Sequence, residues 1–113
     1  TSPVLYLQEK YQTISDLFGI EKQILINDFK AISAAIEKNR TFESYQELSK
    51  MARKAYPETI LSNYYLARFY EETGETKKAM RTYQSAYILN EIAGITKDAV
   101  MEKAELIKED FGY

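Results

Sequence analysis

The chain has 113 residues, of which 45% are apolar and 28% are charged, and its formal net charge at pH 7 is −2. This composition predicts one globular domain with a substantial core and argues against a nucleic-acid-binding surface, which normally carries a strong basic excess. The absence of cysteine and histidine excludes disulfides, thiol chemistry, His-containing triads and imidazole metal sites. We therefore expect no cofactor and no metal. A run of about 18 apolar residues, as a membrane span requires, is also missing.

Apolar residues recur at steps of three and four along nearly the whole chain, which predicts an all-α protein. The first helix is expected within 1–20, beginning at Ser2-Pro3 and ending at Gly19. The second has its apolar face from Leu25 to Ile36. The remaining predicted helices cover 42–56, 58–73, 76–90 and 96–110, the last capped by Thr96. About six helices with short links indicate antiparallel hairpins stacked side by side.

The strongest internal pattern lies in 60–93, where small and aromatic residues keep fixed distances on both sides of one glycine. The residues that carry it are Leu66, Ala67, Tyr70, Gly74, Ala79, Tyr83 and Ala86. Their order and spacing resemble the tetratricopeptide repeat, a helix–turn–helix unit of about 34 residues. Asn63 stands where that repeat typically has tryptophan, and Glu91 replaces its closing proline, which leaves the end of the fifth helix open.

Close packing explains this pattern physically. Two helices of a hairpin approach closely only where small residues meet, and we assign this role to Ala67 and Ala79. Tyr70 and Tyr83 fill the space beside them. Gly74 reverses the chain with a positive φ, which glycine adopts without penalty.

The resemblance implies a short tetratricopeptide-like α-solenoid that occupies 1–113 as a single domain. Within it we distinguish a linker or capping helix (1–20), a degenerate repeat (24–59), the best repeat (60–93) and a C-terminal capping helix (96–110). A chain that starts with Thr1 is expected to be a segment of a longer protein, the alternative being a processed mature chain. A generic helical bundle is the alternative to the solenoid.

Proteins with such repeats usually bind extended peptides in a concave groove, and the groove-facing candidates here are Leu61, Tyr64, Arg68 and Glu71, with Lys30 about one period earlier. Arg68 has the geometry to bind a carboxylate, or it pairs with its neighbours Glu71 or Glu72. The lysine and asparagine set of carboxylate-clamp domains is missing.

Two further groups of residues have a structural and a functional interpretation. Ten tyrosines are present. We expect Tyr11, Tyr45, Tyr70 and Tyr83 in the core, and leave Tyr6, Tyr64 and Tyr113 open between core and partner contact. Glu71, Glu72 and Glu75 form an acidic cluster. Glycosidases use paired carboxylates, but a solvated cluster at a helix end fits these three better.

The stretch LQEKYQTISDLFGIEK carries a second resemblance, through Tyr11, Ile14, Ser15, Phe18 and Gly19. It is similar to the helical linker that follows the catalytic domain in certain bacterial esterases of the α/β-hydrolase type. This resemblance implies an ester-hydrolysing parent, periplasmic or extracellular if it is exported, whose nucleophile and histidine lie upstream.

We therefore predict a non-catalytic protein-interaction module. Its partner is another domain of the parent chain, a second copy in a homodimer, or a peptide. The alternative is a free-standing adaptor or regulator that binds an extended peptide in the groove, and a carboxylate enzyme is a third hypothesis.

Overall fold

The computed structural model describes residues 26–92 and 94–113, and this part of the chain is helical, with two isolated β-bridges in its loops. Five α-helices and a short 3₁₀-helix follow one another: α2 (Ile26–Asn39), α3 (Ser44–Ala55), α4 (Ile60–Glu72), α5 (Thr76–Ser85), η1 (Ala86–Ile88) and α6 (Lys97–Phe111). The third, fourth and sixth predicted helices begin and end within two residues of α3, α4 and α6. The first predicted helix, with the 11–19 motif, lies outside the described residues.

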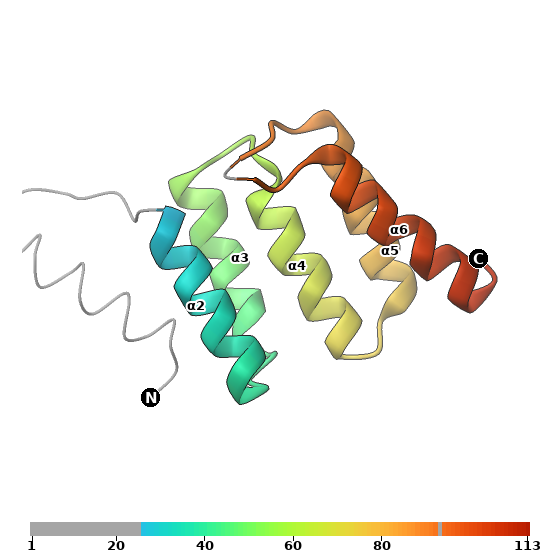
Figure 1. Cartoon of the computed structure of the whole chain (residues 1–113), viewed down its shortest axis with the longest axis horizontal. Coiled ribbons are helices and arrows are strands. Elements are labelled where there is room, and N and C mark those ends of the chain that lie inside the picture. Colours follow the sequence, from blue (N-terminus) through green and yellow to red (C-terminus); the bar gives the residue numbers. More distant parts are fainter. Residues whose placement is uncertain (1–25, 93) are drawn as a thin grey trace, which may run out of the picture.

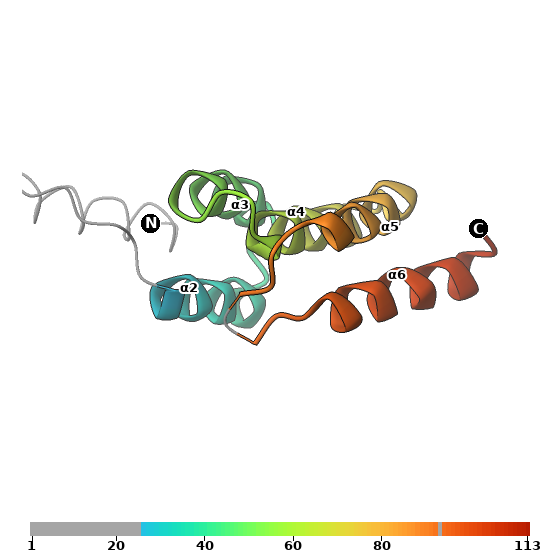
Figure 2. The same cartoon turned by 90° about the horizontal axis from the view of Figure 1, so that it is seen from above.

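Consecutive helices run antiparallel and pack side by side, which confirms the predicted all-α stack of helical hairpins (Figure 1). Figure 2 shows two layers. Helices α3, α4 and α5 form one row, and α2 and α6 form a second row on one side of it. The middle helix α4 therefore has neighbours on both flanks. We call its side between α2 and α6 the inner face, and its opposite side, next to α3, the outer face.

The core consists of two clusters that meet at α4. The first contains buried residues of α2, α3 and α4: Phe29, Ile32, Ile36, Tyr45, Leu48, Ala52, Leu61 and Tyr65. The second contains buried residues of α4, α5, η1 and α6: Ile60, Ala67, Ala79, Met80, Tyr83, Ala86, Val100, Ala104 and Ile107. Each hairpin thus packs on its neighbour in the chain, as in a solenoid.

The small-residue pattern has the predicted packing role. Ala67 of α4 and Ala79 of α5 are both fully buried in the second cluster, and Tyr83 is buried beside them. Tyr70 was expected in the core, but it is only half-buried, and the ammonium group of Lys78 lies over its ring at 5.7 Å. Its ring packs against the second cluster, so Tyr70 lies at the edge of the core.

The fifth helix is shorter than predicted. The expected range was 76–90, but α5 ends at Ser85 and the chain tightens into η1. The cause is a tertiary contact: the amide of Ile60 donates to the carbonyl of Asn90 (2.9 Å), and the amide of Asn90 donates to the carbonyl of Glu58 (2.8 Å). Because these bonds tie Asn90 to the start of α4, residue 90 cannot continue the helix. Glu91 then accepts a hydrogen bond from the amide of Lys97 at the start of α6 (2.8 Å).

Two predicted helix boundaries, the start of α6 at Thr96 and the end of α4 before Gly74, are confirmed. The hydroxyl of Thr96 accepts a hydrogen bond from the amide of Ala99 (3.1 Å) and so caps α6. Gly74 has φ +83°, and beyond it the amide of Glu75 donates back to the carbonyl of Tyr70 (2.8 Å). This bond is typical of a helix that ends on a left-handed residue.

We predict that Gly74→Ala lowers the free energy of unfolding by about 1–2 kcal/mol, the cost of a left-handed conformation for a residue with a Cβ. Backbone strain alone carries this effect, because an added Cβ would have no neighbouring atom within 4 Å. Urea denaturation followed by circular dichroism measures it. Gly74→Asn is the control: asparagine tolerates positive φ, so it should lose clearly less. Equal losses for the two variants would contradict the argument.

Candidate functional site

Arg68 lies at the centre of the inner face and binds three carboxylates from two helices. Its Nη2 donates to Oε1 of Glu37 on α2 (2.7 Å) and to Oε1 of Glu72 (2.9 Å), and its Nη1 donates to Oε2 of Glu71. Its Nε adds a longer bond to Glu37 (3.2 Å). The side chain is only 14% exposed. This guanidinium therefore joins α2 to α4 and has little donor capacity left for a ligand.

Glu37 extends the network to α3. The hydroxyl of Tyr45 donates to Oε1 of Glu37 (2.7 Å) and lies 3.0 Å from Oγ of Ser33. The guanidinium carbon of Arg68 lies 5.8 Å from the centroid of the Tyr45 ring. One polar network thus connects α2, α3 and α4 above the first core cluster.

The pKa values of the network follow from these contacts. Burial disfavours the ionised form of Glu37, but hydrogen bonds from Tyr45 and Arg68 and the charge of Arg68 lower its pKa overall. Burial and the bond to Glu37 raise the pKa of Tyr45 to about 12. Burial works to lower the pKa of Arg68, yet its bonds to Glu37 and Glu71 raise it. At neutral pH Glu37 and Arg68 are therefore charged and Tyr45 is neutral.

The side chains of α6 also reach the inner face. The ammonium group of Lys103 lies 5.9 Å from the centroid of the Tyr64 ring, and Tyr64 contacts the rings of Tyr65 and Tyr83. The buried hydroxyl of Tyr83 forms no hydrogen bond within the described residues. Burial, followed by the charge of Glu71, raises the pKa of Tyr83.

The structure changes the interpretation of the predicted partner-binding residues. Leu61 was predicted to face the groove, but it is fully buried in the first core cluster. Arg68 is already paired with carboxylates, including both predicted neighbours, so it is not available to a peptide. Tyr64 is half-buried, whereas Lys30 is exposed on α2 and remains accessible. Glu37 was missed because it lies 31 residues before Arg68, beyond any local pattern.

Each carboxylate of the acidic cluster forms an ion pair. Glu71 and Glu72 pair with Arg68, and Glu75 pairs with the exposed Lys78 at 3.0 Å. Residues 26–92 and 94–113 contain no group of three or more acidic, histidine or cysteine side chains placed to hold a metal ion. Nor does any helix in these two ranges have the length and apolar content to cross a membrane.

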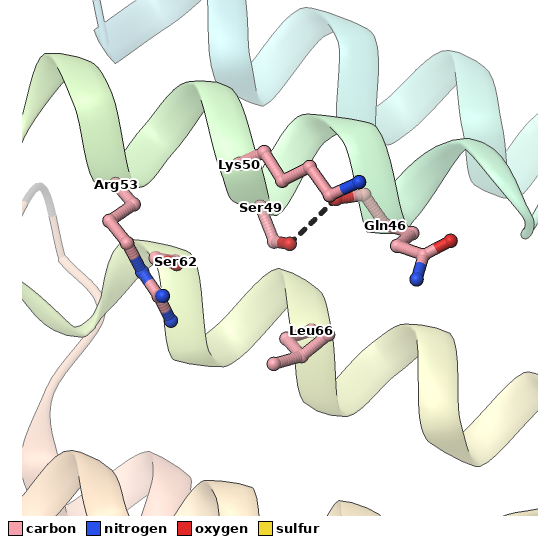
Figure 3. Close-up of a pocket in the computed structure, with 6 residues that line it drawn as sticks. All are labelled: Gln46, Ser49, Lys50, Arg53, Ser62 and Leu66. Atoms are coloured by element: carbon pink, nitrogen blue, oxygen red, sulfur yellow. Dashed lines mark hydrogen bonds between the residues drawn. The ribbon is translucent and has the colours of Figure 1, made fainter.

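The outer face carries a shallow pocket of about 230 Å³ between α3 and α4 (Figure 3). Four of the residues that line it come from α3 and two from α4: Gln46, Ser49, Lys50, Arg53, Ser62 and Leu66. With 100° per residue, Ser62 and Leu66 lie on the side of α4 opposite Tyr64 and Arg68. No sequence pattern marks this pocket, because its residues are common polar and aliphatic types on two separate helices.

Comparison with known proteins gives one informative match. No family model and no curated protein matches the sequence. The crystal structure of an uncharacterised protein from Capnocytophaga ochracea DSM 7271 is similar, with a TM-score of 0.91 and 35% sequence identity. The match covers 96% of this chain and 31% of that chain. This chain therefore spans about a third of the length of the protein whose fold it shares.

Proposed function

We propose that this chain is a non-catalytic, tetratricopeptide-like interaction module that docks onto another part of a longer polypeptide. The observation that carries this proposal is the match to the Capnocytophaga ochracea protein, of which this chain covers only 31%. Domains within one chain commonly contact each other through surfaces of modest size. The paired state of Arg68, Glu71 and Glu72 supports the non-catalytic part of the proposal.

Exposed apolar side chains near the C-terminal end of the module support a docking role. They lie in η1, on α6 and just after it: Tyr87, Ile88, Leu106, Phe111 and Tyr113. Ile88 is 86% exposed and Leu106 is 51% exposed, and the rings of Phe111 and Tyr113 stack at 5.8 Å. These five side chains are apolar area that docking on another domain or protein would cover.

The adaptor hypothesis has less support, because Leu61 is buried and Arg68 is occupied by Glu37, Glu71 and Glu72. The esterase resemblance stays a prediction, since its residues in 11–19 lie outside the described part of the chain. A Gly-x-Ser-x-Gly turn after a predicted strand in the upstream coding sequence would support a hydrolase parent. Another array of helical repeats there would support an adaptor.

We predict that the isolated chain self-associates as its concentration rises, because the apolar residues that dock in the parent are uncovered. Sedimentation velocity measures this directly. The double variant Ile88→Lys/Leu106→Lys should remain monomeric with an unchanged circular dichroism spectrum. Glu105→Lys, next to Leu106 on the exposed side of α6, is the control and should associate like the wild type. A wild-type chain that stays monomeric at all concentrations would contradict the docking role and favour the adaptor.

A further inference from the structure

The outer-face pocket contains two cations without a counter-charge. Lys50 and Arg53 lie one turn apart on α3, and both line the pocket. Figure 3 shows Arg53 extending from α3 toward the start of α4, where Ser62 lies. Neither cation forms an ion pair with the residues that the structure describes, whereas Arg68 and Lys78 do. The pocket therefore presents a net positive charge on a chain whose overall charge is −2.

A hydroxyl without a protein partner in the described part of the chain lines the same pocket. Ser49 and Ser62 are the two buried polar residues of the described chain, and both line it. Ser49 donates to the carbonyl of Gln46 (2.7 Å). Ser62 is only 5% exposed, yet its hydroxyl forms no hydrogen bond with any described residue. Because this hydroxyl is not among the side-chain atoms that are sealed from solvent without a partner, it opens into the pocket and is free to donate to a ligand there.

The size of the pocket limits what it can hold. About 230 Å³ is below the range of roughly 300–1,000 Å³ that is usual for cofactors and drug-sized ligands. One functional group fits, and an oxygen anion suits it best, because both charged side chains around it, Lys50 and Arg53, are cations. Arginine binds the two oxygens of a carboxylate with two parallel hydrogen bonds. Leu66 and the aliphatic part of Lys50 offer apolar contact to a short methylene stem.

We propose that this pocket binds the carboxylate of an aspartate or glutamate side chain on an acidic segment of a partner polypeptide. In the bound state Arg53 binds the carboxylate oxygens and Lys50, whose ammonium group lies toward Gln46 in the free chain (Figure 3), turns to join it. Ser62 donates a hydrogen bond to the same group, and Leu66 contacts the stem. The proposal rests on the proposed function only in that the carboxylate belongs to a docking partner. It assigns that contact to the outer face, away from Ile88 and Leu106.

An NMR titration of the full chain tests this assignment. The probe is a blocked peptide, N-acetyl-Ala-Glu-Glu-Ala-amide, and the matched control peptide has glutamine in place of glutamate. We expect saturable shifts of the amides of 46–53 and 62–66 and of the Nε–H of Arg53 with the glutamate peptide alone. Arg53→Gln should weaken binding about tenfold, as expected for loss of a bidentate charged contact. Lys54→Gln is the control, since Lys54 is an exposed cation on α3 that does not line the pocket, and should bind like the wild type.

Three results would overturn the proposal. The first is equal shifts with the glutamine peptide, and the second is unchanged binding by Arg53→Gln. The third is tighter saturable binding of inorganic phosphate at the same amides, which would assign the pocket to a free oxyanion. Sedimentation of Arg53→Gln separates this proposal from the docking function. Self-association through the apolar surface should persist in this variant even where the pocket fails to bind a carboxylate.

Discussion

Replacing Tyr65 with alanine is expected to lower the free energy of unfolding by about 3–5 kcal/mol, as is usual for removing a buried aromatic side chain. Tyr65 is 1% exposed in the first core cluster. Its ring stacks on Tyr45 (centroids 5.8 Å apart) and on Phe29 (6.3 Å), and meets Tyr64 edge-on (5.7 Å). Alanine would leave a cavity between α2, α3 and α4 that three surrounding rings cannot fill. Since domains of this size are stable by about 5–15 kcal/mol, this loss would remove a large fraction of the stability.

Urea denaturation monitored by circular dichroism measures this loss. Tyr65→Phe is the matched control, because it keeps the ring and removes only a hydroxyl, and it should cost less than about 1.5 kcal/mol. If Tyr65→Ala lost no more than Tyr65→Phe, the ring would not be a central element of the core.

Replacing Arg68 with methionine is expected to lower the free energy of unfolding by about 2–3 kcal/mol, somewhat less than for breaking a fully buried ion pair. Methionine keeps most of the side-chain volume but removes the cation that Glu37, Glu71 and Glu72 share. The three carboxylates would then repel one another at the junction of α2 and α4. Lys78→Met is the control: its pair with Glu75 is exposed and screened by solvent, so this variant should lose clearly less than Arg68→Met.

The effect of Arg68→Met should also depend on pH. In the folded wild type the pKa of Glu37 is lowered from its ordinary value of 4.5. A lowered folded pKa stabilises the fold above the unfolded pKa, and this stabilisation is lost as the pH falls through the folded pKa. The wild type should therefore lose stability on acidification below about pH 4.5, and the variant should lose less. Urea denaturation at pH 7 and at pH 3.5 measures both. A difference between the two proteins that did not narrow at pH 3.5 would contradict the role of Glu37.

The architecture was predictable because its signals are local. Helical spacing marked α3, α4 and α6 to within two residues, Thr96 marked the start of α6, and Gly74 marked the turn between α4 and α5. The early end of α5 was not predictable, because it depends on Asn90 pairing with the start of α4, some 30 residues earlier. No spacing rule within 76–90 carries that information.

The candidate sites were less predictable, for a reason that lies in α4. This helix packs on both flanks, so Ile60 and Leu61, which are adjacent in sequence, are buried in different clusters. Helical periodicity alone therefore placed Leu61 in a groove, although it is buried in the first core cluster. Arg68 was placed correctly beside Glu71 and Glu72, but its partner Glu37 comes from another hairpin. The outer-face pocket requires knowing that Ser49 and Ser62 meet across two helices.

The central position of α4 has a consequence for how the protein unfolds. In an extended array each unit can melt while its neighbour survives. Here the single helix α4 contributes Leu61 and Tyr65 to one core cluster and Ile60 and Ala67 to the other. Unfolding of α4 would remove buried contacts from both clusters at once. Neither hairpin is therefore expected to fold independently. A destabilising substitution in one cluster should therefore lower the stability of the other, and the domain should unfold in one cooperative transition.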